Sequence, residues 1–129
     1  MAQLADRKQP PNISEFKTTL LNRRQKVLHE MNILRRKILA EKKAEIETIR
    51  FHNNSRGSRA KYLSKRKIYT MLLIEANEYL QKLEAALQRI EKGIYGFCLK
   101  TGKRIPTEQL KAIPHRKYCE EVRYKFVMN

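Results

Sequence analysis

Two cysteines and one histidine near the carboxyl-terminal end are the side chains of this sequence that could hold a metal. Cys98 and Cys119 offer soft thiolate ligands, and His115 lies four residues before the second of them. These three ligands with one water would form a zinc site of the open kind. A side chain directly after Pro114 need not point toward the thiols, so we favour the alternative that both cysteines are small buried core residues. Both interpretations stay open on these residues alone.

The rest of the sequence gives no sign of catalytic machinery. It contains no glycine-rich phosphate loop, no nucleophile with a nearby base, and no pair of carboxylates in a context that forms a cleft. His29 and His52 stand alone on the predicted hairpin, with no partner nearby in sequence, and we expect both at the surface. Two cysteines are also too few for a disulfide scaffold. We therefore expect a binding protein and not an enzyme.

The chain carries a large excess of positive charge. Twenty-nine Lys and Arg against thirteen Asp and Glu give a formal net charge of +16, which favours an anionic partner such as nucleic acid or an acidic protein surface. No carboxylate occurs between Glu47 and Glu75. We predict that polar and basic side chains near the start of this window contact the partner, namely Arg50, Asn53, Asn54, Arg56, Arg59 and Lys61.

Apolar residues recur at helical spacing in two long segments. The first stripe follows Pro10-Pro11 and consists of Phe16, Leu20, Val27, Met31, Leu34 and Ile38, with Ile46 and Ile49 as an extension. The second precedes the cap signal Lys92-Gly93 and consists of Leu72, Ala76, Tyr79, Leu83, Leu87 and Ile90. We predict a mostly α protein with a flexible lead-in over 1–11, an antiparallel coiled-coil hairpin over 12–92 with its tip near 51–58, and a small globular end over 93–129.

Some apolar residues fall outside these stripes, namely Leu21, Leu28, Leu39, Leu73 and Ile74. They could bury against a second copy, pack on the globular end or broaden the stripes, and the sequence leaves the oligomeric state open. No segment reaches the roughly 20 apolar residues that cross a bilayer, and the first residues lack the apolar run of a secretory signal. We expect a soluble cytoplasmic protein that does not bind membranes.

Glycines, prolines and both cysteines gather in the segment from Gly93 to Val122. This segment resembles the carboxyl-terminal finger of the DksA/TraR family, whose pattern is G-x-Y-G-x-C-x-x-C-G, then I-P-x-x-R-L-x-A-x-P, then C-x-x-C. The matching positions are Gly93, Tyr95, Gly96, Cys98, Gly102, Ile105, Pro106, Leu110, Ala112, Pro114 and Cys119. The resemblance implies that Thr101 and Val122 replace the second and fourth zinc-binding cysteines, which leaves Cys98 and Cys119 as an incomplete zinc site.

The same resemblance implies a transcription regulator that binds bacterial RNA polymerase. Members of the family insert the hairpin into the secondary channel of the polymerase, where an acidic tip acts near the catalytic magnesium. The tip of this chain is basic, which implies a different mechanism. The charge supports an alternative, a nucleic-acid or ribosome-associated protein with Tyr62 and Tyr69 as stacking partners, although their spacing of seven equally fits residues between two packed helices.

Overall fold

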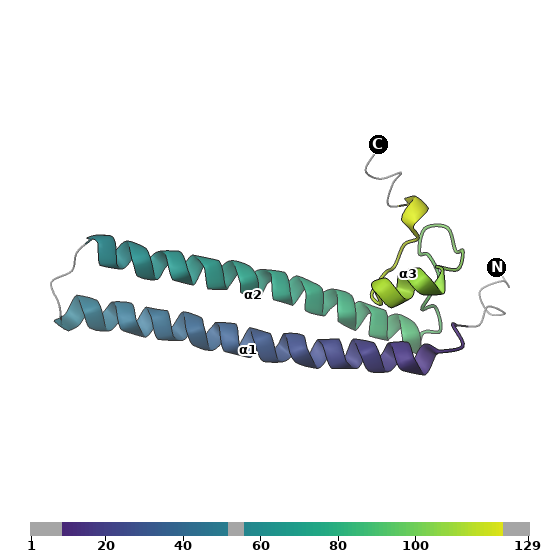
Figure 1. Cartoon of the computed structure of the whole chain (residues 1–129), viewed down its shortest axis with the longest axis horizontal. Coiled ribbons are helices and arrows are strands. Elements are labelled where there is room, and N and C mark those ends of the chain that lie inside the picture. The colour runs from purple at the N-terminus through teal and green to yellow at the C-terminus, as the bar shows by residue number, and fades with distance from the viewer. Residues whose placement is uncertain (1–8, 52–55, 123–129) are drawn as a thin grey trace. The chain divides into compact units, whose positions relative to one another are not determined.

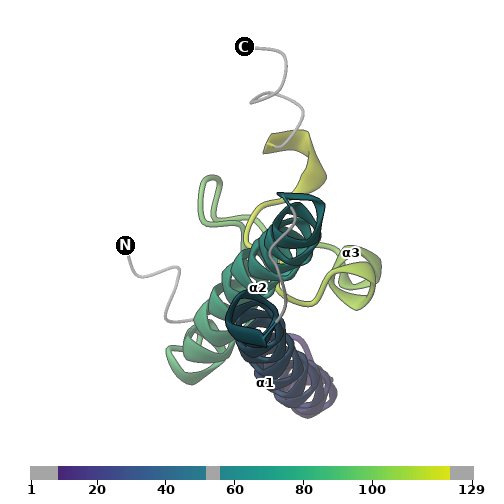
Figure 2. The ribbon, with the colours of Figure 1, turned by 90° about the vertical axis from the view of Figure 1, so that its left-hand side faces the viewer.

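The chain folds as a helical hairpin followed by a small finger, in a computed structural model that describes residues 9–51 and 56–122. For residues 51 and 56–59 only the backbone is described. The long helices are α1 (Ile13–Phe51) and α2 (Arg56–Glu91), and a short helix α3 (Thr107–Ala112) lies in the finger. Figures 1 and 2 show α1 and α2 side by side and antiparallel. The predicted mostly α fold with a long helical hairpin is confirmed.

Two compact units divide the chain. The first joins Met1–Arg24 with Gln81–Asn129, so it holds the base of the hairpin and the finger, and the second is Gln25–Leu80, the distal part of the hairpin. The predicted division at residues 11 and 92 stays a prediction. None of the described helices is long and apolar enough to cross a membrane.

The side chains that pack α1 against α2 recur every three or four residues, and we call them the seam. In α2 the buried and half-buried seam positions are Tyr62, Arg66, Tyr69, Leu73, Ala76, Leu80, Leu83, Leu87 and Ile90. In α1 they are Phe16, Leu20, Arg23, Val27, Met31, Leu34, Ile38, Glu41, Glu45 and Thr48. The seam is therefore apolar in the first unit and becomes polar toward the hairpin tip.

Four residues that we predicted in the stripes lie outside the seam, and of these Tyr79 is half-buried. Ile46, Ile49 and Leu72 are 52%, 43% and 44% exposed, so these assignments are wrong. The distal seam is instead built from polar pairs, because Arg66 forms an ion pair with Glu45, and the hydroxyl oxygens of Thr48 and Tyr62 are 3.1 Å apart in a hydrogen bond. Polar groups at such positions fix the register of two helices, although they contribute less stability than apolar ones.

Gly93 ends α2 as the sequence predicts. It adopts a φ of +76°, and its N–H donates to the carbonyl of Ile90 at 3.1 Å while the N–H of Ile94 donates to that of Arg89 at 3.0 Å. This pair of hydrogen bonds is the Schellman motif, which satisfies carbonyls that the last turn of a helix leaves open. The chain then turns into the finger, where Tyr95 and Leu110 have no exposed surface.

Replacing Leu83 by Ala should lower the free energy of unfolding by about 2–5 kcal/mol, because Leu83 is fully buried in the seam of the first unit. Urea denaturation followed by circular dichroism measures the difference. Leu39→Ala is the matched control: its side chain is 66% exposed on α1, and the change should stay within about 0.5 kcal/mol. Equal losses for the two variants would contradict the seam.

Gly96 should tolerate a side chain less well than Gly93. Both have positive φ, +89° and +76°, so Ala at either position is strained. A Cβ on Gly96 would also lie 3.0 Å from Cγ and Cδ of Pro10, whereas one on Gly93 meets nothing within 4 Å. We expect Gly96→Ala to destabilise the chain by about 1–3 kcal/mol more than Gly93→Ala in thermal denaturation. The reverse order would show that Pro10 does not pack on the finger.

Candidate functional site

The first half of the finger is a tight loop closed by backbone hydrogen bonds. The N–H of Cys98 donates to the carbonyl of Lys103, and the N–H of Gly102 donates back to the carbonyl of Cys98, both at 2.8 Å. An antiparallel bridge pairs Phe97 with Arg104 beside this loop. The N–H of Leu99 then donates to the carbonyl of Lys117 at 2.9 Å. This last bond brings the loop next to the segment that carries Cys119.

The sulfur of Cys98 is the chemically distinctive atom of the loop. Burial of the thiol, which is 2% exposed, raises its pKa. Hydrogen bonds from the Thr101 hydroxyl and from the backbone N–H groups of Cys119, Thr101 and Lys100 outweigh burial and lower the pKa to about 6. Donors from both halves of the finger therefore hold the pKa of the buried Cys98 thiol well below its ordinary value.

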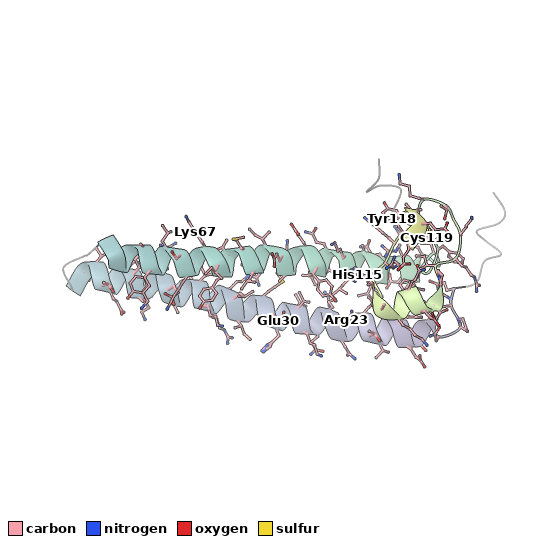
Figure 3. All side chains as sticks on the ribbon, turned by 45° about the horizontal axis from the view of Figure 1, so that its top comes forward. Arg23, Glu30, Lys67, His115, Tyr118 and Cys119 are labelled. Atoms are coloured by element: carbon pink, nitrogen blue, oxygen red, sulfur yellow. The ribbon has the colours of Figure 1, made fainter. Side chains whose placement is uncertain are left out.

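These residues do not fit a structural zinc ion. The Thr101 hydroxyl donates a hydrogen bond to Cys98 where a second thiolate would be needed, and the buried Val122 side chain has no ligand atom. His115, labelled with Cys119 in Figure 3, does not complete a ligand set with the two cysteines: within residues 9–51 and 56–122 no three His, Cys, Asp or Glu side chains come together as metal ligands. Whether the chain binds zinc stays a prediction to be tested in solution.

The surroundings of His115 also disfavour a cation. Burial lowers the pKa of this imidazole, and the positive charges of Lys82, Arg23, Arg89 and Arg116 lower it further. The side chain is therefore neutral at pH 7 but lies in a positive field. The cluster joins cations from α1, α2 and the finger.

Tyr95 and Arg89 hold the second half of the finger in place. The buried Tyr95 hydroxyl donates to the carbonyl of Pro114 at 2.7 Å, and the Arg89 guanidinium donates to the carbonyl of His115 at 3.1 Å. Burial raises the pKa of Tyr95 to about 12, although the charge of Arg89 acts in the opposite direction. Phe16 packs on the Tyr95 ring with centroids 5.7 Å apart.

Sequence reasoning missed the role of Arg89, which is 8% exposed. The one feature of the sequence that could have indicated this role is the position of Arg89, one turn before Gly93 and among seam residues.

The predicted partner contacts at the hairpin tip are only partly described. Arg50 and Lys61 are exposed, as predicted contacts should be. Arg56 and Arg59 lie in the first turn of α2, but their side chains, like all of Asn53 and Asn54, lie outside the described residues.

The two tyrosines proposed as stacking partners are engaged in the seam. Tyr62 is hydrogen-bonded to Thr48, and the ammonium of Lys37 lies 5.5 Å from the centre of the Tyr69 ring. Both side chains are half-buried. Of the two roles that the spacing allowed, the structure therefore favours the seam.

The fold places this chain among DksA-like helical hairpins with a finger. No protein-family model matches the sequence. The fold is similar to that of transcription factor DksA2 from Pseudomonas aeruginosa, with a TM-score of 0.74 over 99% of this chain and 98% of that chain. Sequence identity between the two is 21%, so the likeness concerns the fold alone.

Curated bacterial proteins are similar to part of the chain. It is 38% identical over 63 residues to the uncharacterized protein YteA and 43% identical over 44 residues to general stress protein 16O, both from Bacillus subtilis. It is 48% identical over 40 residues to an uncharacterized protein from Aquifex aeolicus. These matches span 49%, 34% and 31% of this chain, but only 26%, 27% and 28% of the three relatives.

The ionised Cys98 should make stability depend on pH. Its folded pKa of about 6 lies below the ordinary value of 9.0, so the stabilisation is fully present above pH 9 and is lost as the pH falls through 6. The loss of unfolding free energy caused by Cys98→Ala should therefore grow from pH 6 to pH 9, by at most about 1.4 kcal/mol per pH unit. Urea denaturation with a chelator present measures it.

Val122→Ala is the control for this experiment, because it truncates a buried neighbour in the finger without removing a titratable group. Its effect on unfolding should not vary over the same pH range. A constant effect of Cys98→Ala from pH 6 to pH 9 would show that the thiol is not ionised in the folded protein.

Proposed function

We propose that this protein is a transcription regulator that acts in the cytoplasm by binding bacterial RNA polymerase through its helical hairpin. The observation that carries the proposal is the fold shared with the transcription factor DksA2 over nearly the whole of both chains. The motif that resembles the DksA/TraR finger supports it independently, because it lies at the matching place after the hairpin. In this proposal the hairpin enters the secondary channel of the polymerase.

The chemistry of the tip determines what the hairpin can do in such a channel. Arg50 and Lys61 are exposed near the two helix ends, and no carboxylate occurs between Glu47 and Glu75. A basic tip is repelled by a bound magnesium ion and attracted by phosphates and carboxylates. We propose that the tip acts on acidic groups of the polymerase or on nucleotide phosphates, and not on the catalytic metal.

A second candidate is a nucleic-acid or ribosome-associated protein. The observation in its favour is the charge of the distal hairpin, where residues 25–80 contain thirteen Lys and Arg but six Glu. Such a surface binds phosphate backbones with a steep dependence on salt. The seam positions of Tyr62 and Tyr69 weigh against this candidate. Both rings are engaged between the two helices, so they do not serve as stacking partners for nucleic-acid bases.

The tagged chain should retain core RNA polymerase at low salt after nuclease treatment. The double variant Arg50→Glu, Lys61→Glu should reduce the retained polymerase about tenfold or more, since each change reverses an exposed charge near the tip. Quantitative immunoblotting of a polymerase subunit after pull-down measures the ratio.

The matched control is Lys17→Glu, Lys26→Glu, which reverses two exposed charges of α1 far along the chain from the tip. It should retain polymerase within about twofold of the parent chain. Recovery of ribosomal particles or nucleic acid in place of polymerase would favour the second candidate, and absence of both would contradict the first.

A further inference from the structure

The distal hairpin has apolar residues on its surface and polar residues in the part of its seam nearest the tip. Glu41, Glu45, Arg66 and Thr48 occupy seam positions there. Nine large apolar side chains of this unit are exposed, namely Ile33, Leu39, Ile46, Ile49, Leu63, Ile68, Met71, Leu72 and Ile74. Scattered apolar residues on a surface are ordinary, so the question is whether these nine gather on one side.

The seam register answers this. Taking Ile38, Glu45, Arg66 and Leu73 as heptad position a, positions b and e lie on one side of the hairpin, c and g on the other, and f at the back. Six of the nine fall at positions b, e or the adjoining f, three from each helix: Leu39, Ile46, Ile49, Leu63, Met71 and Ile74. Five of the nine residues thus lie at positions b or e, Met71 at position f adjoins them, and the other three lie at positions c or g.

A shallow hollow lies between the two helices on this same side. Its volume is about 530 Å³, and both helices line it. Its lining consists of Ile38, Lys42, Leu63, Arg66, Lys67, Thr70 and Met71. Lys42 at position e of α1 and Leu63 and Thr70 at position e of α2 thus line the same hollow. The register predicts this, because e positions of the two helices lie on the same side of an antiparallel hairpin.

Within residues 34–50 and 60–74 the side with the hollow also carries only positive charge, and beyond this stretch Glu78, an exposed carboxylate at position f, lies one turn after Ile74. At positions b, e and f, residues 34–50 and 60–74 contain no carboxylate, and their exposed cations are Arg35, Arg36, Lys42, Lys43, Arg50 and Lys67. Among the described residues none of these six forms an ion pair. The nearby glutamates lie elsewhere, because Glu41 and Glu45 pair with Lys65 and Arg66 and Glu47 is at position c. We call these six cations and the six apolar residues the apolar-cationic face.

We propose that the apolar-cationic face binds an acidic amphipathic helix of a partner protein, which would lie along the hairpin as a third helix. Leu, Ile or Met side chains of that helix would fill the hollow beside Leu63 and Met71, and its flanking carboxylates would pair with Lys42 and Lys67. Lys67 extends from α2 into solvent, where such a helix can reach it (Figure 3). The proposal does not depend on whether the partner is RNA polymerase.

Two other occupants fit less well. A second copy would place two faces without carboxylates against each other, and the like charges would repel. A bilayer surface favours basic amphipathic helices with aromatic anchors, but the exposed members of this face are aliphatic, and the hollow accommodates side chains better than it follows a flat surface. An acidic amphipathic helix can fill the hollow with its apolar side chains and pair its carboxylates with the cations of the face.

The test is a fluorescence-anisotropy titration of the full chain against a synthetic acidic helical peptide about three heptads long, with Leu at positions a and d and Glu and Ala elsewhere. The matched peptide has Lys in place of Glu. We expect the acidic peptide to bind at least about tenfold tighter than the basic one. Met71→Glu, Ile74→Glu should weaken the acidic peptide at least about tenfold, because both substitutions introduce carboxylates into the face.

Ile68→Glu, Leu72→Glu is the matched control. It replaces two exposed apolar residues of the same helix by Glu, but at positions c and g on the opposite side. Its affinity for the acidic peptide should stay within about threefold of the parent chain. Circular dichroism and urea denaturation establish that both variants keep the parent fold, so that a loss of binding is not a loss of structure.

Several results would overturn the proposal. Equal weakening by the two double variants would mean that net charge, and not this face, governs binding. Equal affinity for the acidic and basic peptides would also contradict it. Binding of the parent chain to phosphatidylglycerol vesicles without binding to the acidic peptide would assign the face to lipid. A dimer in sedimentation that Met71→Glu, Ile74→Glu dissolves would assign it to a second copy.

Discussion

A buried hydroxyl group holds the finger to its own base. The Tyr95 hydroxyl, four residues after the end of α2, donates to the carbonyl of Pro114, nineteen residues later. The Arg89 guanidinium donates to the next carbonyl, that of His115. A buried carbonyl without a donor costs about 1–3 kcal/mol, so these two bonds determine which way the second half of the finger can pack. The hydrogen bond from the N–H of Leu99 to the carbonyl of Lys117 then brings the segment of Cys119 to the loop of Cys98, where the N–H of Cys119 is one of the donors that lower the pKa of the Cys98 thiol. The finger is thus cross-connected by hydrogen bonds at the place where the sequence predicted an incomplete zinc site.

In the hairpin, polar contacts between the helices replace apolar packing toward the tip. Near the finger the seam contains Leu20 and Leu83, which are fully buried, whereas toward the tip it contains the Glu45–Arg66 ion pair and the Thr48–Tyr62 hydrogen bond. Polar contacts of this kind specify the register of the two helices. In that register Leu63, Met71 and Ile74 lie on the surface, where a partner can cover them.

The sequence predicted the larger elements because their signals are local. The stripe from Phe16 to Ile38 and the cap at Gly93 each depend on a few neighbouring residues, and α1 and the end of α2 agree with them. The register of the two helices near the tip could not be predicted from such local signals, because the prediction assumed that each apolar residue at helical spacing packs between the helices. Ile46, Ile49 and Leu72 violate that assumption, and only the burial of Glu45 and Tyr69 against the partner helix reveals the true seam.

The candidate site was predicted in part. The spacing of Cys98 and Cys119 and the resemblance of the finger directed attention to the loop of Cys98. The lowered pKa of its thiol depends in part on the N–H of a residue 21 positions away and could not be predicted from spacing. The hydrogen bond from Arg89 could not be predicted either, because its acceptor, the carbonyl of His115, is distant in the sequence. The tip contacts Asn53 and Asn54 lie outside the described residues and stay predictions.

The central claim is that the hairpin binds RNA polymerase at its secondary channel. The most direct measurement is a cryo-electron microscopy reconstruction of host core polymerase mixed with the full chain. The account predicts density for α1 and α2 inside the secondary channel, with the tip directed toward the active centre. A reconstruction at full occupancy with the hairpin bound elsewhere on the polymerase, or only on the nucleic acid, would contradict it.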